Sequence, residues 1–133
     1  MKQKESRYPE DWLRIGQKEL RRAEILLAAG DFEGAGFNIQ QAIEKYLKGF
    51  LLAKGWKLRK IHDLETILND AVVYEQSLGK YRADLQKITE YYVIDRYPLT
   101  ITSELTDEEI KKSFELALQL INEITLMIDE FKG

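Results

Sequence analysis

Apolar side chains recur at intervals of three and four residues along almost the whole chain, and this spacing is the feature that most limits its fold. It matches the helical period of 3.6 residues and not the two-residue period of a strand. Only two prolines occur in the 133 residues, Pro9 and Pro98, and both lie where a helix can begin or end. The pattern therefore predicts an all-α protein.

Capping residues divide this pattern into four or five helices. Asp31 is expected to cap one helix, Gly55 to stop it in the left-handed conformation, and Thr106 to open the last helix in a capping box with Glu109. Short connections between such helices predict one antiparallel up-and-down bundle spanning residues 1–133 as a single domain. The expected helices cover roughly 9–30, 31–54, 63–74, 81–95 and 106–131.

The helix expected at 31–54 carries apolar residues on two faces. Ile39, Ile43 and Phe50 fall on the larger face, whereas Phe37 and Leu51 fall on the opposite one. A helix of this kind is either central in its bundle or uses the second face for a partner.

Composition excludes several kinds of site. The chain has no cysteine, so it can form neither a disulfide nor a thiolate zinc site, and it has a single histidine, His62. One imidazole rules out a multi-histidine metal site and limits histidine acid–base catalysis to one residue. We expect no metal and no cofactor. The net charge of −3 excludes a strongly basic nucleic-acid coat but leaves room for a local basic patch.

Sequence motifs and hydropathy narrow the function classes further. No glycine-rich phosphate loop, no Glu-x-x-His pair and no nucleophile elbow is present. No apolar run approaches the roughly 20 residues that cross a bilayer, and the N-terminal residues lack the apolar centre of a secretory signal. We expect a soluble, cytoplasmic protein with no membrane partner.

One group of candidate site residues lies at the margin of the apolar face of the helix expected at 31–54. Lys45 and Lys48 share this margin with Gln41, and such half-dehydrated polar groups usually have partners. Two interpretations stay open: Lys45 binds phosphate, or Lys48 pairs with Glu44 one helical turn away.

A second candidate is the loop at 55–63, where lysine and arginine residues alternate with Trp56 and His62. Basic side chains beside a tryptophan suit single-stranded nucleic acid, because the charge meets phosphate and the ring stacks on a base. The alternative is that Trp56 packs on the core while the basic residues are simply solvated.

The third candidate is Arg96, in the stretch "DRYPLTIT" at 95–102. A planar guanidinium can hold a phosphate group with two hydrogen bonds, and Tyr97 beside it could stack on a base. The alternative is that Arg96 is a surface cap at the end of its helix.

The motifs occur in an order that resembles the HEPN domain family, named for higher eukaryotes and prokaryotes nucleotide-binding. The resemblance runs from about residue 12 to 131. It is carried by "QQAIEKYLK" at 40–48, "HDLETIL" at 62–68 and "DRYP" at 95–98.

The resemblance implies a helical bundle that forms homodimers and acts beside a minimal nucleotidyltransferase, often as part of a toxin–antitoxin pair. It also implies nucleotide or RNA-phosphate binding, here through Arg96 and Tyr97 with Lys45 and Lys48. For the dimer surface we expect Phe37 and Leu51.

Many members of this family are metal-independent ribonucleases that use an arginine followed four to six residues later by a histidine. Arg96 matches the arginine, but 100–102 reads Thr-Ile-Thr, and no histidine follows His62. Threonine cannot replace imidazole as a base near neutral pH. We therefore expect a binding subunit without nuclease activity. Two alternatives remain: a ribonuclease centred on Arg96 with His62 or a tyrosine as the base, and a purely structural interaction subunit.

Overall fold

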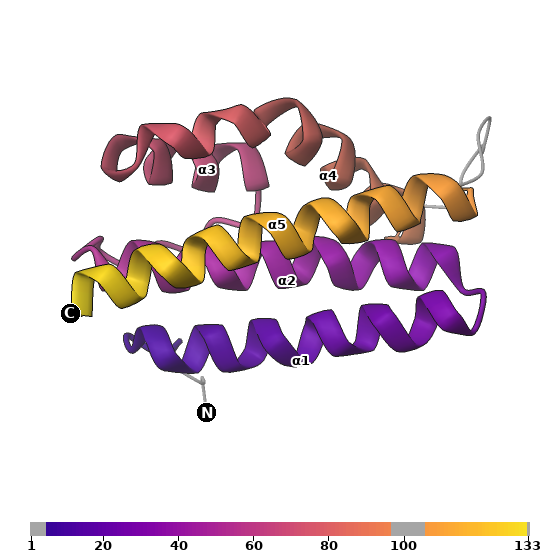
Figure 1. The fold of residues 1–133 in the computed structure, drawn as a ribbon, viewed down its shortest axis with the longest axis horizontal. Helices are drawn as coiled ribbons and strands as arrows, with labels where there is room; N and C mark the ends of the chain where they lie inside the picture. The colour runs from indigo at the N-terminus through magenta and orange to yellow at the C-terminus, as the bar shows by residue number, and fades with distance from the viewer. Residues whose placement is uncertain (1–4, 97–105, 133) are drawn as a thin grey trace.

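Five α-helices make up the part of the protein that the computed structural model describes, residues 5–96 and 106–132, with side chains described for 5–90 and 106–129. A short 3-10 helix, η1 (Gln76–Tyr81), occupies the break expected between the third and fourth of them. In chain order the helices are α1 (Pro9–Ala28), α2 (Phe32–Ala53), α3 (Leu64–Tyr74), α4 (Arg82–Arg96) and α5 (Asp107–Lys132) (Figure 1).

The helices form an antiparallel up-and-down bundle around α2. α1 runs antiparallel to α2, α5 runs in the same direction as α2, and α4 runs opposite to both (Figure 1). α3 and α4 pack on the side of α2 that faces away from α1. The predicted fold class is confirmed. None of the helices in the described ranges is both long and apolar enough to cross a membrane.

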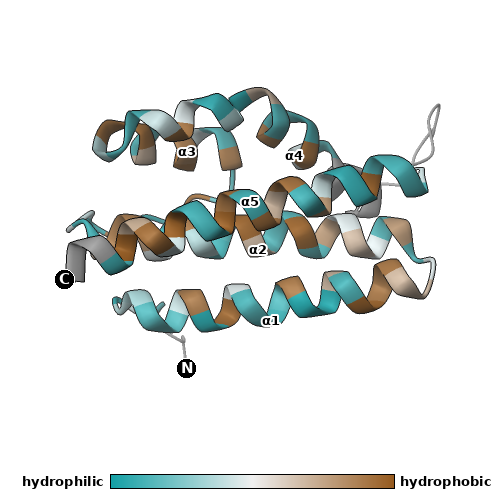
Figure 2. Cartoon of the chain, in the orientation of Figure 1, coloured by the Kyte–Doolittle hydropathy of each residue, from teal (hydrophilic) through white to brown (hydrophobic). Residues whose placement is uncertain are grey.

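The hydrophobic core surrounds α2, which packs against every other α-helix. Apolar residues recur along the inward sides of α2 and α5, as Figure 2 shows. Burying one such side chain contributes about 1.5–3 kcal/mol to the free energy of unfolding. Of the two alternatives that the sequence left open for the helix at 31–54, the structure has the central position in the bundle. Fully buried members of the core include Ile39, Ile43, Leu47 and Phe50 from α2, Leu85 from α4, and Leu120 and Ile124 from α5.

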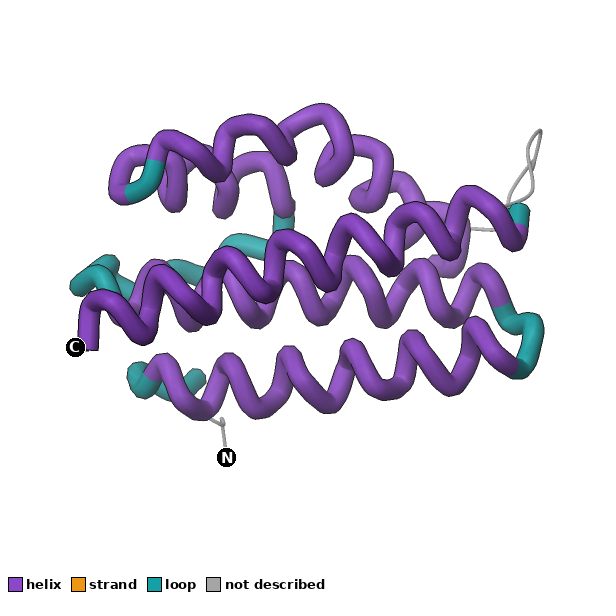
Figure 3. The backbone as a smooth tube through the Cα atoms, in the orientation of Figure 1, coloured by secondary structure: helices purple, strands orange, loops and turns teal. Residues whose placement is uncertain are grey.

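Asp31, Gly55 and Thr106 lie at the helix ends where their sequence positions predict, and Figure 3 shows the loops that join α1 to α2 and α2 to α3. Gly30 and Gly55 have φ angles of 84° and 90°, which the absence of a Cβ atom permits. The Asp31 carboxylate accepts a hydrogen bond at 2.9 Å from a backbone N–H in the first turn of α2. The Thr106 hydroxyl accepts one at 3.1 Å from the backbone N–H of Glu109. No strand occurs within residues 5–96 or 106–132.

Two glycines allow α1 and α2 to approach each other closely. A Cβ atom built at Gly16 of α1 would lie 2.7 Å from the ring of Tyr46 on α2. A Cβ atom built at Gly49 of α2 would lie 2.8 Å from the side chain of Leu13 on α1. Since both distances are far below van der Waals contact, a larger residue at either position would push the two helices apart.

Leu51 does not lie on an outer face of α2, where the sequence pattern had placed it. Leu51 is fully enclosed in the core because α2 is covered on more sides than its apolar stripe alone suggests. Phe37, its expected companion in a dimer surface, is half-buried. Leu51 therefore offers no accessible surface to a second chain, whereas Phe37 retains some.

Candidate functional site

A cluster of charged side chains surrounds the carboxylate of Glu44 in the middle of α2. The Oε2 atom of Glu44 lies 3.0 Å from Nζ of Lys45 and 3.3 Å from Nζ of Lys48. It also lies 3.2 Å from Nδ1 of His62, in the loop between α2 and α3. We call these four residues the Glu44 cluster.

Local helix geometry and one aromatic ring position this cluster. Lys48 follows Glu44 by four residues, so the helix places both side chains on one face. The ring of Trp12, in the first turn of α1, lies 5.1 Å from Nζ of Lys48 and 5.9 Å from Nζ of Lys45, within the range of a cation–π contact. The indole N–H of Trp12 donates to the carbonyl of Ser6 at 2.8 Å, which fixes the orientation of the ring.

Lys48 is buried, and its burial corrects the expectation that it lies at the accessible margin of α2. Its side chain has no exposed surface, and that of Glu44 is 1% exposed. Their ion pair, one of the two alternatives that the sequence left open, is therefore present. A buried charge is stable only when it is paired, so Lys48 is committed to Glu44 and to the face of Trp12. Its ammonium group is not accessible to a phosphate in this conformation.

Lys45 and His62 form the accessible edge of the Glu44 cluster. The Lys45 side chain is partly exposed, and its Nζ also donates to the Gln41 side chain at 3.3 Å. The His62 side chain is 72% exposed. The other oxygen of Glu44, Oε1, is buried without a hydrogen-bond partner among the described residues. Two lysines against one carboxylate leave this edge with a positive charge, which suits an anion rather than a metal ion. Across the described residues, no set of three or more potential metal ligands comes together.

In the loop at 55–63, Trp56 packs on the core, which is one of the two alternatives that the sequence left open. The indole N–H of Trp56 donates to the carboxylate of Asp70 on α3 at 3.1 Å, and its ring packs against the core. The guanidinium of Arg59 lies 3.5 Å from the same carboxylate. Both groups are therefore engaged by α3, and Trp56 is half-buried.

Arg96 and the two lysines lie in different parts of the bundle. Arg96 is the last residue of α4, at the end of the molecule where α5 begins (Figure 1). Lys45 and Lys48 lie instead against Trp12, close to the start of α1. The side chain of Arg96 and the whole of Tyr97 lie outside the described residues. Within one chain, the backbone therefore does not bring Arg96 next to Lys45 and Lys48.

A second polar contact, between η1 and α5, was not expected from the sequence. The hydroxyl of Tyr81 donates to Glu123 at 2.7 Å, and Nζ of Lys80 donates to the same carboxylate at 2.8 Å. The hydrogen bond from Lys80 lowers the pKa of Glu123, with a further contribution from Tyr81. Burial raises the pKa of Tyr81, and its hydrogen bond to Glu123 raises it further. This contact joins segments 42 residues apart, so no local motif could have indicated it.

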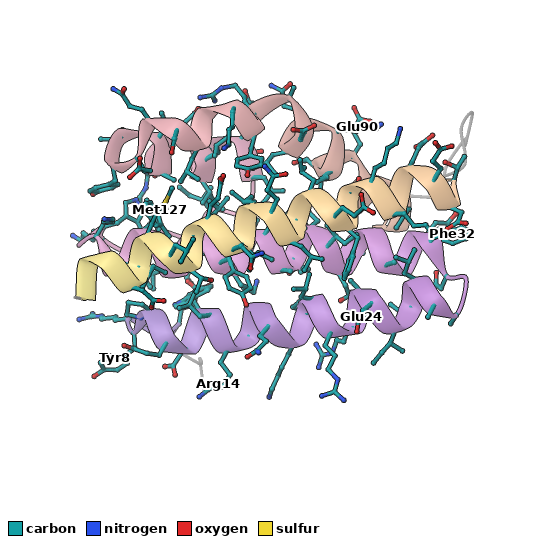
Figure 4. All side chains as sticks on the ribbon, viewed as in Figure 1. Tyr8, Arg14, Glu24, Phe32, Glu90 and Met127 are labelled. Carbon is teal, nitrogen blue, oxygen red and sulfur yellow. The ribbon has the colours of Figure 1, made fainter. Side chains whose placement is uncertain are left out.

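The pairing of His62 with Glu44 was missed for the same reason. The two residues are 18 positions apart, and only the loop between α2 and α3 brings them together. Figure 4 shows the side chains of the bundle, with charged groups on its outer surfaces and between α1 and α5. The tertiary structure thus brings Glu44, Lys45 and Lys48, from the motif at 40–48, together with His62, from the motif at 62–68.

Comparisons with known proteins agree on the family. The family model for the HEPN domain matches residues 9–127 of the chain. A crystal structure of an archaeal HEPN homologue is similar to the bundle with a TM-score of 0.73, covering 91% of this chain and 98% of the other at 22% sequence identity. A comparison with curated proteins found no significant match. At this identity the structural likeness concerns the fold alone, whereas the family model covers most of the sequence. The chain belongs to the HEPN domain family.

Proposed function

We propose that this protein is a nucleotide- or RNA-phosphate-binding subunit that holds its ligand through Arg96. In this proposal it acts in the cytoplasm as a homodimer beside a minimal nucleotidyltransferase, in a pair of the toxin–antitoxin kind, and does not cleave RNA. The observation that carries the proposal is an arginine at the end of α4 with no histidine after it in the chain. A guanidinium can bind phosphate without a proton-transfer partner, whereas metal-independent RNA cleavage needs one.

The position of His62 supports a binding role over a nuclease role. It is the only imidazole in the chain, and it contacts Glu44 rather than the end of α4. Within one chain it is therefore not placed to act as the base for Arg96. The dimer partner would have to supply an imidazole from the same position, next to its own Glu44.

Lys45 is a secondary candidate for contact with the ligand. Its partly exposed side chain lies at the edge of the Glu44 cluster, which also includes the exposed side chain of His62. Because Lys45 and Arg96 are separated along the bundle, an extended RNA strand suits both better than one mononucleotide. An RNA that reaches both residues is therefore expected to bind more tightly than ATP or GTP.

Titration calorimetry with ATP, GTP and a 12-nucleotide RNA tests the ligand part of the proposal. Arg96→Ala is expected to weaken binding by about tenfold or more, since a charge-assisted bidentate pair contributes about 1.5–3 kcal/mol. Arg82→Ala, at the opposite end of α4, is the matched control and is expected to bind like wild type. Absence of binding by all three ligands would remove this part of the proposal.

The nuclease alternative is tested by incubating labelled RNA with the pure protein in EDTA. We expect the RNA to remain intact. Cleavage that persists in EDTA and disappears in Arg96→Ala would replace the proposed binding function with a diverged ribonuclease. The proposed partner is tested by co-expressing this chain with a minimal nucleotidyltransferase encoded in a neighbouring reading frame. If the two proteins do not co-purify, only the ligand-binding part of the proposal is left.

A further inference from the structure

A surface groove runs along the junction of α1 and α5, and it is not part of the Glu44 cluster or of the end of α4. α1 packs chiefly on α2 and touches α5 little, so the two helices leave a hollow of about 490 Å³ between them. A second hollow continues the first toward the turn between α1 and α2, and Glu24 lines both. Figure 4 shows Glu24 between α1 and α5, and Phe32 beside the start of α5.

The length of the groove corresponds to a short helix. Its lining residues on α1 extend from Arg14 to Ala28. At a rise of 1.5 Å per residue this is about 21 Å, the length of roughly four helical turns. A helix seated there would contact α1 and α5 together and complete a helical bundle on this side of the molecule.

The rim of the groove on α1 is basic, although the chain as a whole is acidic. Arg14, Lys18 and Arg21 line the groove at intervals of four and three residues, so they form one stripe along α1. Arg14 is paired with Asp11 at 3.3 Å. Lys18 and Arg21 form no ion pair with any residue that the structure describes, which leaves two uncompensated positive charges on this rim.

The floor and opposite wall of the groove are apolar. Leu20 of α1 and Phe114 of α5 line it where they pack on the edge of the core, and Leu118 of α5 is 38% exposed. An apolar strip beside a basic rim is complementary to an amphipathic helix that carries leucine-like side chains on one face and carboxylates next to them.

Charge decides among the possible occupants. In a two-fold interface the groove would face its own copy, and its first hollow carries three basic side chains, Arg14, Lys18 and Arg21, against one carboxylate, so the net charge opposes self-association. A nucleic acid would gain from the basic stripe, but it would also face Glu24 and a floor of mainly aliphatic groups, with Phe114 as the one aromatic ring in the first hollow. An acidic amphipathic helix matches both the stripe and the floor.

We propose that the α1–α5 groove docks an acidic amphipathic helix of a partner protein. The carboxylates of this helix pair with Lys18 and Arg21, and its apolar face covers Phe114 and Leu118. The part of the helix opposite Glu24 is neutral or basic, which fixes its direction in the groove. The proposal is independent of Arg96, so it stands or falls separately from the proposed ligand binding.

Fluorescence anisotropy tests the proposal with two labelled peptides of 18 residues. One is an amphipathic sequence of leucine, alanine and glutamate whose glutamates lie only in one half, to face Lys18 and Arg21, and the other has lysine in place of every glutamate. We expect saturable binding of the acidic peptide and none of the basic one. The Lys18→Glu/Arg21→Glu variant is expected to bind the acidic peptide about tenfold more weakly than wild type and to bind the basic peptide, which wild type does not.

The control variant is Lys57→Glu/Lys87→Glu, which makes the same change in net charge at exposed positions outside the groove. It is expected to bind the acidic peptide like wild type. Leu118→Asp, also at the surface, is expected to abolish binding while leaving the thermal unfolding midpoint unchanged within a few degrees.

Several results would overturn the proposal. Equal binding of both peptides, or unchanged binding by Lys18→Glu/Arg21→Glu, would show that the groove does not select an acidic helix. Tighter binding of a 12-nucleotide RNA that is lost in the same variant would assign the groove to nucleic acid. A wild-type dimer that Leu118→Asp converts to a monomer in sedimentation velocity would assign it to a second copy.

Discussion

The Nδ1 atom of His62 lies 3.2 Å from Oε2 of Glu44, so an imidazole that is largely exposed contacts a carboxylate that is almost entirely enclosed. This contact attaches the loop between α2 and α3 to the middle of α2. It also places the only histidine of the chain away from the end of α4. The same contact therefore bears on both the stability of the bundle and the proposal that Arg96 binds phosphate without cleaving RNA.

Glu44→Ala is expected to lower the free energy of unfolding by about 3–5 kcal/mol, because it leaves the ammonium group of Lys48 buried without its carboxylate. Urea denaturation at pH 7 measures the change. The double variant Glu44→Leu/Lys48→Met removes both charges at similar volume and is expected to lie within about 1.5 kcal/mol of wild type. A single variant as stable as wild type would contradict the buried ion pair.

His62→Ala is expected to cost less than about 1 kcal/mol, since its contact with Glu44 is made by an exposed side chain. The same urea titration measures it. Because His62 does not lie at the end of α4, the variant is also expected to bind RNA within about twofold of wild type. A loss of RNA binding as large as that of Arg96→Ala would instead place both residues in one site.

Gly16→Ala is expected to destabilise the bundle by about 1–2 kcal/mol. The added methyl group would meet the ring of Tyr46 at 2.7 Å, and relieving such overpacking costs more than the roughly 1 kcal/mol that alanine gains over glycine in a helix. Gly79→Ala is the control, since its nearest neighbour, Val72, lies at 3.8 Å. Thermal unfolding of both variants measures the change. A Gly16→Ala variant that melts at or above the wild-type temperature would contradict the close packing of Gly16 on Tyr46.

Glu123→Gln is expected to reduce the stability of the bundle at pH 7 but much less at low pH. The hydrogen bond from Lys80 lowers the pKa of Glu123 from its ordinary value of 4.5, so the folded state favours the ionised form. That stabilisation is present above pH 4.5 and is lost as the pH falls through the lowered pKa. The free energies of unfolding of wild type and variant, measured by urea titration across this range, should therefore converge as the pH is lowered.

Tyr81→Phe tests the other side of the same contact. The pKa of Tyr81 is raised by burial, so the neutral phenol contributes stability that is present below pH 10 and is lost as the pH rises through the raised pKa. Removing the hydroxyl is expected to cost about 1 kcal/mol at pH 7. A variant with unchanged stability at pH 7 would show that the bond to Glu123 contributes nothing.

Phe37→Glu and Leu51→Glu are expected to behave differently in light scattering and thermal unfolding. Leu51 is enclosed in the core, so a buried carboxylate there should cost several kcal/mol and unfold the bundle. Phe37 retains accessible surface, and we expect its variant to stay folded and to shift a dimer toward monomer. A folded Phe37→Glu dimer, indistinguishable from wild type, would place the dimer surface elsewhere.

The helices could be predicted from the sequence alone, because each depends on information carried within a few residues. The apolar period identified them, and local caps such as Asp31, Gly55 and Thr106 set their ends through hydrogen bonds or φ angles close in sequence. Apolar residues on two faces of α2 also indicated that both faces are covered, although not whether the bundle or a partner covers the second one.

The tertiary structure determines which polar groups meet. Glu44 contacts His62 across 18 residues, and Tyr81 contacts Glu123 across 42, with no periodic signal to connect either pair. It also decided that Leu51 and Lys48 are enclosed, because burial depends on how many helices surround a residue and not on the residue itself. The groove between α1 and α5 arises in the same way, from two helices that pack on α2 and leave their shared edge open.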